Sequence, residues 1–528
     1  MRSITQTKLI IYTSIFLVLF DNYSFYNEVI KIYPFSGLNI LYIISLIIFL
    51  IALTNFLLSL ISSKYTIKPI LILVLLTSSF TTYFMNTYHV VIDDSMIRNA
   101  MQTDIKESMD LFSFQLIVYV TLLGISPSYI VYKIPLEYNT FKKEIFSKFK
   151  SIILSLIIIV VVIFGFSKFY TSFLREHKPL RYYTNPTYWI YSIGNYLNKT
   201  LNSGPIVVKQ IGLDAKVVRD KNKHHKLVIL VVGEALRADH FGLNNYDKDT
   251  TPLLEKQNDI INFSQFYSCG TSTAYSVPCM FSPLKRGDYS YKKDIRTQNV
   301  MDIINRIDSI DILWRDNNSD PKGVMKRIGY QDYKNNTINT ISTNGEPRDE
   351  GMLVGLDKFI QNNQDKDKLI VLHMMGNHGP EYYKRYTKEF AKFKPVCKTN
   401  QLENCTKQEI QNSYDNAVLY TDYFLNKTIN FLSKYDKNYQ TALFYLADHG
   451  ESLGEKGIYL HGLPYFMAPD AQKHTAAFMW FGDSFKVDKK IVENKKDKQL
   501  SQDNLFSTLL GLFDIKTKEY EKDMDILK

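Results

Sequence analysis

Five long apolar runs occupy the first third of this 528-residue chain, and they exclude an entirely water-soluble fold. The runs cover residues 9–20, 38–61, 70–88, 111–132 and 152–166. A helix needs about 20 largely apolar residues to cross a hydrocarbon layer of ~30 Å, and most runs reach that length with their aromatic flanks. Asp21 and Asn22 interrupt the first run, but no small-residue cleavage site follows it. We therefore predict a bundle of five transmembrane helices within residues 1–168.

Basic residues between the runs predict the orientation of this bundle. Nine of them fall on one side of the predicted spans: Arg2, Lys8, Lys64, Lys68, Lys133, Lys142, Lys143, Lys148 and Lys150. Three fall on the other side: Lys31, Arg98 and Lys106. Because cytoplasmic loops carry the excess of Lys and Arg, the amino terminus should lie inside the cell. Five spans then place the remainder of the chain in the periplasm of a Gram-negative cell, anchored to its inner membrane.

The rest of the chain has the composition of a soluble α/β protein. Residues 169–225 are rich in Tyr and Trp, which suits either a helix lying at the lipid headgroups or an aromatic-rich linker. Residues 226–528 contain short apolar runs that alternate with helical stretches, a pattern typical of a mostly parallel sheet between helices. The net charge of +10 is modest and dispersed, so it suits an anionic membrane surface and gives no support for a nucleic-acid partner.

Polar residues follow four of these apolar runs directly. Glu234 ends the first run, Asn317 the second, His378 closely follows the third, and Asp448 with His449 ends the fourth. A lone glutamate or histidine in such a place is usually a helix-start carboxylate or a hydrogen-bonded structural group. Sites in parallel sheets form beyond the carboxyl ends of the strands, so four such ends together favour one ligand-binding crevice. Oxygen and imidazole ligands suit zinc better than magnesium or manganese.

Two of only four cysteines bracket the hydroxyl-rich stretch CGTSTAYSVPC, residues 269–279. Disulfides persist in the periplasm, and the neighbouring pairs are Cys269 with Cys279 and Cys397 with Cys405, although three pairings are formally possible. A staple here would hold a hydroxyl such as that of Thr273 rigidly on the metal, unless the stretch is only a surface turn. TAYS could begin a helix, and Pro278 would then lie in its first turn or mark a break.

Several segments carry a resemblance to a known family. CGTSTAYSVPCMFS, VVGEALRADHFG, WRDNNSDPKGV, MGNHGPEYYKRY and ADHGESLGE closely resemble the lipid A phosphoethanolamine transferases, which include the mobile colistin-resistance enzymes and belong to the alkaline phosphatase/sulfatase-like superfamily. The resemblance covers essentially the whole chain. It implies an amino-terminal membrane bundle of five helices joined to a sulfatase-like α/β domain.

The resemblance also assigns roles to residues. It implies that Thr273 is the nucleophile and a zinc ligand, and that Glu234, Asp448 and His449 are the other ligands of one zinc ion. His378 and His461 resemble outer histidines that handle the transferred group or hold a second metal. Two further residues resemble positions that contact substrate: Ser319 and Lys322. NTISTNGEPRDEG, around Asn344, lacks the additional disulfide that some relatives carry.

The outer loop before the fourth span carries Asn99, Thr103 and Glu107, spaced i, i+4 and i+8. In a helix these side chains would share one face. The family uses such residues for the ethanolamine headgroup, and the carboxylate of Glu107 suits an ammonium. Without the resemblance, a solvated helix face would be the better interpretation.

These features predict a zinc-dependent enzyme that acts as a monomer. It would move phosphoethanolamine from phosphatidylethanolamine to lipid A through a covalent threonine intermediate, release diacylglycerol and lower polymyxin susceptibility. A hydrolase, or a transferase with another glycan or protein acceptor, is the related alternative. A sensor or transporter without turnover belongs to another class, and the scarcity of charges within the spans argues against transport.

Overall fold

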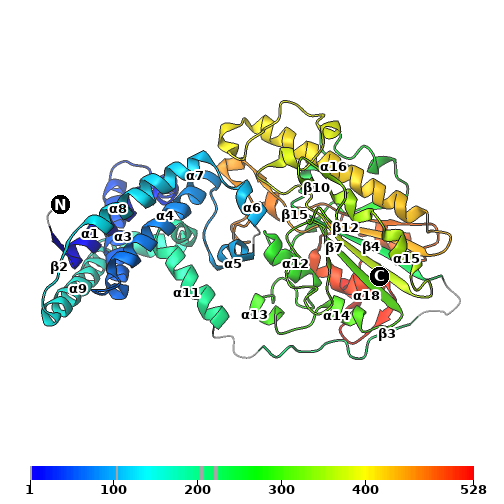
Figure 1. The fold of residues 1–528 in the computed structure, drawn as a ribbon, viewed down its shortest axis with the longest axis horizontal. Coiled ribbons are helices and arrows are strands. Elements are labelled where there is room, and N and C mark those ends of the chain that lie inside the picture. Colours follow the sequence, from blue (N-terminus) through cyan, green and yellow to red (C-terminus); the bar gives the residue numbers. More distant parts are fainter. Residues whose placement is uncertain (1–2, 103–104, 202–205, 219–223) are drawn as a thin grey trace. The chain divides into compact units, whose positions relative to one another are not determined.

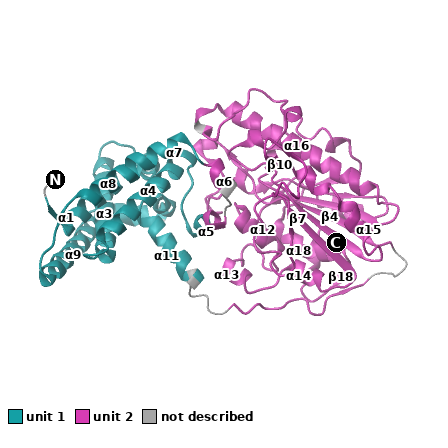
Figure 2. Cartoon of the chain, in the orientation of Figure 1, with its two compact units in different colours: residues 1–97, 112–200 teal, residues 98–111, 201–528 magenta. Residues whose placement is uncertain are grey.

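The computed structural model describes four stretches of the chain: residues 3–102, 105–201, 206–218 and 224–528. The chain divides into two compact units (Figure 2). Unit 1 combines residues 1–97 with 112–200, and unit 2 combines residues 98–111 with 201–528. The short segment 98–111, between two membrane helices, therefore belongs with the carboxyl-terminal unit.

Unit 1 is a bundle of apolar helices. Four of its described helical segments are long and apolar enough to span a membrane: α3 (Asn39–Ile61), α4 (Ile67–Tyr88), the continuous segment Phe114–Lys133 and α9 (Phe141–Gly165). The segment Phe114–Lys133 comprises α7 (Phe114–Tyr119), a π-helical stretch Val120–Ile125 and α8 (Ser126–Lys133). α3 packs against α9, and α4 packs against the segment that contains α8.

The first predicted span is a bent pair of helices. α1 (Gln6–Phe20) and α2 (Tyr23–Ile32) meet at an angle of 56°, and counting them as one span gives five spans. The bend lies at Asp21 and Asn22, the polar residues that interrupt the apolar run. The side-chain amide of Asn22 donates to the carbonyl oxygens of Leu17 and Asn185, and so satisfies backbone groups at the bend.

Aromatic residues after the last span pack onto the bundle. α10 (Ser167–Glu176) buries Phe169 and Phe173 against residues of α2 and α3, and α11 (Thr187–Leu201) buries Trp189. The indole N–H of Trp189 donates to Asn185 over 3.0 Å. Helices α10 and α11 of the predicted interfacial segment therefore pack as part of unit 1.

A seven-stranded sheet forms the centre of unit 2 (Figure 1). Its strand order is β5 (Ile260–Asn262), β16 (Ala477–Phe481), β12 (Gln440–Ala447), β4 (Lys226–Gly233), β11 (Asp367–His373), β7 (Ile310–Asp316) and β8 (Gln331–Asp332). β12, β4, β11, β7 and β8 run parallel, whereas β16 is antiparallel to both of its neighbours. The predicted mostly parallel sheet is therefore confirmed.

Helices cover both faces of this sheet because its central strands are buried on both sides. Alternate residues of β4 point to opposite hydrophobic cores, so Val228 lies in one core and Ile229 in the other. The first core is closed by α12 (Thr273–Phe281), α14 (Val300–Asn305) and α18 (Leu505–Leu512). The second core is closed by α15 (Leu356–Gln361) and α16 (Lys407–Ser433).

Candidate metal and phosphoryl-transfer site

Two adjacent parallel strands place the first two site carboxylates side by side. β4 and β12 pair in a register that aligns Gly233 with Ala447, so Glu234 and Asp448 leave the sheet at neighbouring positions. Both side chains are fully buried. Ala235 adopts a left-handed φ of 55°, and its N–H donates to Oδ1 of Asp448 over 3.1 Å. A strained residue between a strand and its loop is common where a site needs a fixed geometry.

Gly376 allows a third strand end to approach this pair. It follows β11 with a φ of +49°, and a Cβ atom there would lie 2.9 Å from the carbonyl oxygen of Glu234. The N–H of Asn377 donates to that same carbonyl over 3.1 Å. Gly376 is therefore required because a side chain there would collide with the backbone of Glu234. The hydrogen bond from Asn377 holds the loop that carries His378 against the site.

Thr273 brings a hydroxyl to the same point from the first turn of α12. Its Oγ1 donates to Oε2 of Glu234 over 3.1 Å and lies 3.3 Å from Nε2 of His449. The side chain is buried, and Ser272 occupies the N-cap position. The hydroxyl thus lies at the N-terminus of a helix, where backbone N–H groups favour an anionic phosphate.

The donor set fits a divalent cation. Ligand atoms of Glu234, Asp448 and His449 all lie within 4.8 Å of one another. Nε2 of His449 is 3.2 Å from Oε1 of Glu234 and 3.4 Å from Oδ2 of Asp448. Neither carboxylate oxygen accepts a hydrogen bond from any described residue, although both are buried. Two orphaned carboxylate oxygens, an imidazole nitrogen and a hydroxyl match the tetrahedral N/O coordination of zinc.

The charges at this site also call for a cation. Burial and the neighbouring Glu234 raise the pKa of Asp448 to about 6. Burial opposes a charge on His449, but the carboxylates of Asp448 and Glu234 raise the pKa of its imidazole to about 10. Burial likewise opposes ionisation of Glu234, yet the charge of His449 holds its pKa well below the usual value. Two buried carboxylates that favour a positive charge on His449 would equally favour a metal cation at this point.

Asn318 is a site residue that the sequence did not single out. Its side-chain amide donates to Oε2 of Glu234 over 2.7 Å and to the carbonyl of Met374 over 2.9 Å. It is buried and lies two residues after Asp316, the last residue of β7. The motif WRDNNSDPKG contains it, but the spacing of that motif gave no reason to separate Asn318 from its neighbours.

A second group behind the site was also missed. His373, the last residue of β11, is fully buried, and its Nδ1 lies 2.8 Å from Oδ2 of Asp316. The indole of Trp314 donates to the same oxygen over 2.9 Å. Burial opposes a charge on His373, but Asp316 raises the pKa of its imidazole. The ends of β11 and β7 are therefore linked by a buried contact between His373 and Asp316.

The stapled loop is held on the site by more than its disulfide. Both neighbouring cysteine pairs are bonded, Cys269 with Cys279 and Cys397 with Cys405. Gln502 accepts the backbone N–H of Cys269 over 2.7 Å and donates to the carbonyl of Asp448 over 2.7 Å. This single amide thus connects the loop that carries Thr273 with the strand end that carries Asp448.

The expectation for Pro278 was wrong. α12 continues through Pro278 to Phe281, so the proline lies neither in the first turn nor at a break. A proline in a helix interior loses one backbone hydrogen bond, to the residue four positions earlier. Cys279, the residue after Pro278, is held by its disulfide with Cys269, and the helix continues through it to Phe281.

The two outer histidines lie beside His449. The ring centroids of His449 and His461 are 4.2 Å apart, and those of His378 and His461 are 5.8 Å apart. Nδ1 of His461 lies 3.4 Å from both carboxylate oxygens of the buried Glu451. The ring of His461 therefore neighbours the rings of both His449 and His378.

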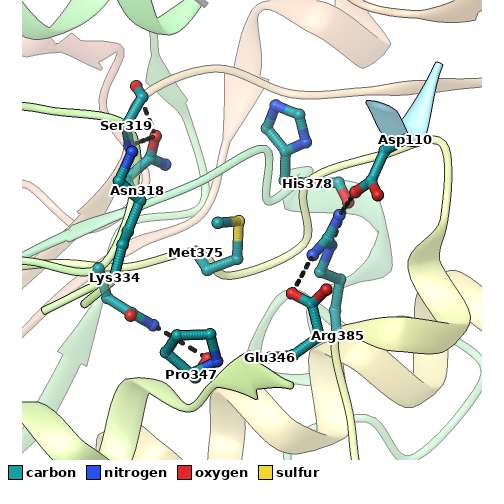
Figure 3. A pocket seen from close by; sticks show the side chains of 10 residues that line it. Asp110, Asn318, Ser319, Lys334, Glu346, Pro347, Met375, His378 and Arg385 are labelled. Carbon is teal, nitrogen blue, oxygen red and sulfur yellow. Dashed lines mark hydrogen bonds and ion pairs between the residues drawn. The ribbon is translucent and has the colours of Figure 1, made fainter. Parts of the chain in front are cut away.

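The predicted substrate-contact residues occupy different surroundings. Ser319 and His378 line one small cavity (Figure 3), whereas Lys322 lines another of about 390 Å³. Nζ of Lys322 donates to the carbonyl of Gln102 over 3.4 Å, so this side chain meets the segment 98–111. The structure thus separates Ser319 and Lys322, which the motif places three residues apart.

The headgroup triad is described only in part. Asn99 is half-buried in α5 (Asp94–Gln102), and Glu107 lies in α6 (Ile105–Asp110). Thr103 lies outside the described residues, as does the side chain of Glu107. The shared helical face of these three residues therefore stays a prediction.

Unit 1 and the sheet of unit 2 define a membrane protein that carries a sulfatase-like α/β domain. The family model "Sulfatase" matches residues 226–515, and the model "Phosphoethanolamine transferase EptA/EptB" matches residues 50–201. The chain is 43% identical over 512 residues to the phosphatidylethanolamine transferase Mcr-2 of Escherichia coli, a match that covers 95% of this chain and 94% of the relative.

Solved structures agree with these matches. The integral membrane protein lipooligosaccharide phosphoethanolamine transferase A (EptA) from Neisseria meningitidis superposes with a TM-score of 0.95 at 34% identity, and the match covers 100% of this chain and 99% of that one. The carboxyl-terminal periplasmic domain of phosphoethanolamine transferase EptC from Campylobacter jejuni has a TM-score of 0.54 at 43% identity, and the match covers 61% of this chain and 98% of that domain.

The chain therefore belongs to the EptA/Mcr family of phosphoethanolamine transferases, as its motifs predicted. It is a multi-pass inner-membrane protein whose sulfatase-like domain lies in the periplasm, which confirms the predicted fold and localisation.

Proposed function

We propose that this chain is a zinc-dependent enzyme that transfers phosphoethanolamine from phosphatidylethanolamine to a phosphate group of lipid A. The observation that carries the proposal is the position of Thr273. Its hydroxyl lies between Glu234 and His449 at a helix N-terminus, and these are the surroundings that a phosphoryl-accepting nucleophile needs.

Two displacements at phosphorus complete the proposed reaction. Oγ1 of Thr273 forms a bond to the phosphorus of phosphatidylethanolamine, and the bond to the diacylglycerol oxygen breaks. Diacylglycerol leaves as an alcohol and takes up the proton that Thr273 gives up. An oxygen of a lipid A phosphate then bonds to the phosphorus of the phosphoethanolamine-threonine, and the bond from that phosphorus to Oγ1 breaks. Oγ1 takes up the proton that the lipid A phosphate group gives up, which restores the Thr273 hydroxyl and leaves phosphoethanolamine on lipid A.

The side chains around Thr273 have distinct parts in these steps. Glu234 accepts the hydroxyl hydrogen bond and orients the nucleophile, and Asn318 fixes that carboxylate in turn. His378 and His461 would carry protons or hold the transferred group, and the contact of the His461 ring with His449 and His378 supports this role. A bound zinc ion, held by Glu234, Asp448, His449 and Thr273, would activate the hydroxyl and neutralise phosphoryl charge. The outer histidines could hold a second ion.

The remaining predicted residues would recognise the donor. Ser319 and Lys322 would contact the phosphate, and Asn99, Thr103 and Glu107 would bind the ethanolamine headgroup. In this proposal residues 1–168 anchor the enzyme, residues 169–225 connect the parts, and residues 226–528 catalyse transfer. A monomer suffices, because one chain supplies every group of the site.

Mass spectrometry of lipid A tests the proposal. A Gram-negative host that expresses this chain should gain lipid A species heavier by one phosphoethanolamine, and the Thr273→Ala variant should give none. The variant removes the nucleophile but little core volume, so its amount and thermal midpoint should match those of the unmodified protein. Unmodified lipid A with release of diacylglycerol would indicate another acceptor, and release of free phosphate or sulfate would indicate a hydrolase.

Polymyxin susceptibility is the expected consequence. Polymyxins are cationic peptides that bind the lipid A phosphates through opposite charge. Each added phosphoethanolamine places an ammonium beside a phosphate and weakens this attraction. Expression should therefore raise the polymyxin concentration that stops growth, and Thr273→Ala should abolish that increase.

A further inference from the structure

The segment 98–111 joins two membrane helices in sequence but packs within the catalytic unit. Near its start, the guanidinium of Arg98 lies 3.8 Å from the centroid of the Tyr291 ring, a cation–π contact at a buried position. Further along, the carbonyl of Gln102 accepts a hydrogen bond from Lys322. The strongest contacts lie at its far end, where α6 stops at Asp110.

Asp110 contacts several residues of the catalytic unit, among them Glu381, whose side chain hydrogen-bonds to it. Its Oδ2 lies 2.6 Å from Nη2 of Arg385 (Figure 3). Its Oδ1 lies 3.2 Å from Nζ of Lys384. Its backbone carbonyl accepts a hydrogen bond from the side-chain amide of Asn400 over 2.9 Å. Both the side chain and the last peptide group of α6 are therefore held.

Arg385 connects Asp110 to the loop that carries His378. Its guanidinium is buried, and its Nε donates to the carbonyl oxygen of His378 over 2.8 Å while Nη2 meets Asp110. Glu346 completes its contacts at 3.3 Å from Nη1 (Figure 3). One planar side chain thus fixes the distance between the end of α6 and the peptide group of His378.

The Cys397–Cys405 disulfide supports the contact between Asn400 and Asp110. Asn400 lies in the loop that the Cys397–Cys405 bond closes, and the N–H of Cys397 donates to Ser413 of α16 over 2.8 Å. The loop is therefore anchored to a long buried helix. It presents Asn400 to Asp110 from a fixed direction.

Stability alone does not account for an ion pair whose arginine is buried and whose aspartate is only partly exposed. Removing two charges from water costs about as much as their attraction returns, and buried pairs are best supported as devices that fix register. The register fixed here is that of α6 against His378. Glu107 precedes Asp110 by three residues in α6, so an attachment at Asp110 also constrains the backbone of the helix that carries Glu107.

We propose that Asp110, Arg385 and Asn400 form a docking clamp, a set of positioning residues that holds the donor-headgroup helix α6 in register with the loop of His378. The clamp rests on the proposed function, because α6 carries Glu107, one of the proposed headgroup residues. It also gives the Cys397–Cys405 disulfide a part in donor binding beyond closing a loop.

Hydrogen–deuterium exchange of the full-length protein in detergent tests the clamp without any turnover. Asp110→Ala and Arg385→Gln should each accelerate amide exchange in peptides that cover residues 105–112, by about tenfold or more, because a contact worth about 1.4 kcal/mol gives a factor of ten. Lys388→Gln is the matched control: it removes one positive charge from an exposed side chain three residues away and should change nothing. Unchanged exchange in Asp110→Ala and Arg385→Gln, or equal acceleration in the control, would overturn the clamp.

Steady-state kinetics with phosphatidylethanolamine separates positioning from a merely structural role. Asp110→Ala should raise the donor KM at least fivefold while kcat changes less than twofold. Arg385→Gln should raise KM similarly and also lower kcat, because it releases the His378 carbonyl. A pure loss of kcat in Asp110→Ala, with KM unchanged, would contradict the clamp. A chain that transfers no phosphoethanolamine would refute the proposed function, and the exchange data would still decide the clamp.

Discussion

Asn318 donates a hydrogen bond from its side-chain amide to Oε2 of Glu234 over 2.7 Å, within the buried interior of the site. The same oxygen accepts the hydroxyl of Thr273 at 3.1 Å. The amide therefore occupies one side of the carboxylate and leaves Oε1 directed toward His449. Such outer partners of metal-binding groups commonly set metal affinity.

We predict that Asn318→Ala weakens zinc binding by about 10–100-fold, the usual cost of losing a partner of this kind. Competition with a chelator of known zinc affinity measures the change. Asn336→Ala is the control, because it makes the same change at an exposed position. It should bind zinc as the unmodified protein does. Equal zinc affinity in both variants would mean that Asn318 does not orient Glu234.

Gly376→Ala should damage the site through the backbone. The residue has a φ of +49°, a conformation that costs an L-residue roughly 1–2 kcal/mol, and the new Cβ would lie 2.9 Å from the Glu234 carbonyl. We expect a lower thermal midpoint together with weaker zinc binding. Gly287→Ala adds the same methyl group where no atom lies within 4 Å, and it should leave both properties intact. A Gly376→Ala variant that retains both would show that the loop can retreat without cost.

The two disulfides should differ in the kinetic constant that they support. Replacing Cys269 and Cys279 by serine should lower kcat more than the double change at Cys397 and Cys405 does, because the first bond closes the loop that carries Thr273. The second double variant should mainly raise the donor KM, since its loop presents Asn400. Equal specific activities of the two folded variants would refute the positioning role of the first bond.

Much of the architecture could be predicted from local patterns of apolar and polar residues, because these patterns reflect which side chains are buried in the membrane or in the protein core. The apolar runs gave the membrane helices, and the four strands that end at polar residues gave the sheet and the cluster of Glu234, Asp448 and His449. The bend at Asp21 and Asn22 was visible only as a weak span. Its geometry depends on Asn185, which is far away in sequence.

The residues that support the site could not be predicted in the same way. Gln502 and Asn400 act through hydrogen bonds to backbone groups more than 200 residues away in the chain, and such contacts impose no spacing on the sequence. Pro278 is a case in which a local sequence rule predicted the wrong structure. A local rule argued against a helix interior, and the adjacent disulfide and the packing of α12 outweighed it.

The central claim is that Thr273 carries the transferred group, and trapping that group tests it most directly. The full-length enzyme would be mixed with phosphatidylethanolamine labelled in its headgroup, quenched within a single turnover, and digested for peptide mass spectrometry. We predict one phosphoethanolamine on the peptide that contains Thr273, absent after zinc is removed by chelation and restored when zinc is returned. Label on another residue, or no labelled peptide from an enzyme that is turning over, would contradict the account and favour direct displacement by the acceptor.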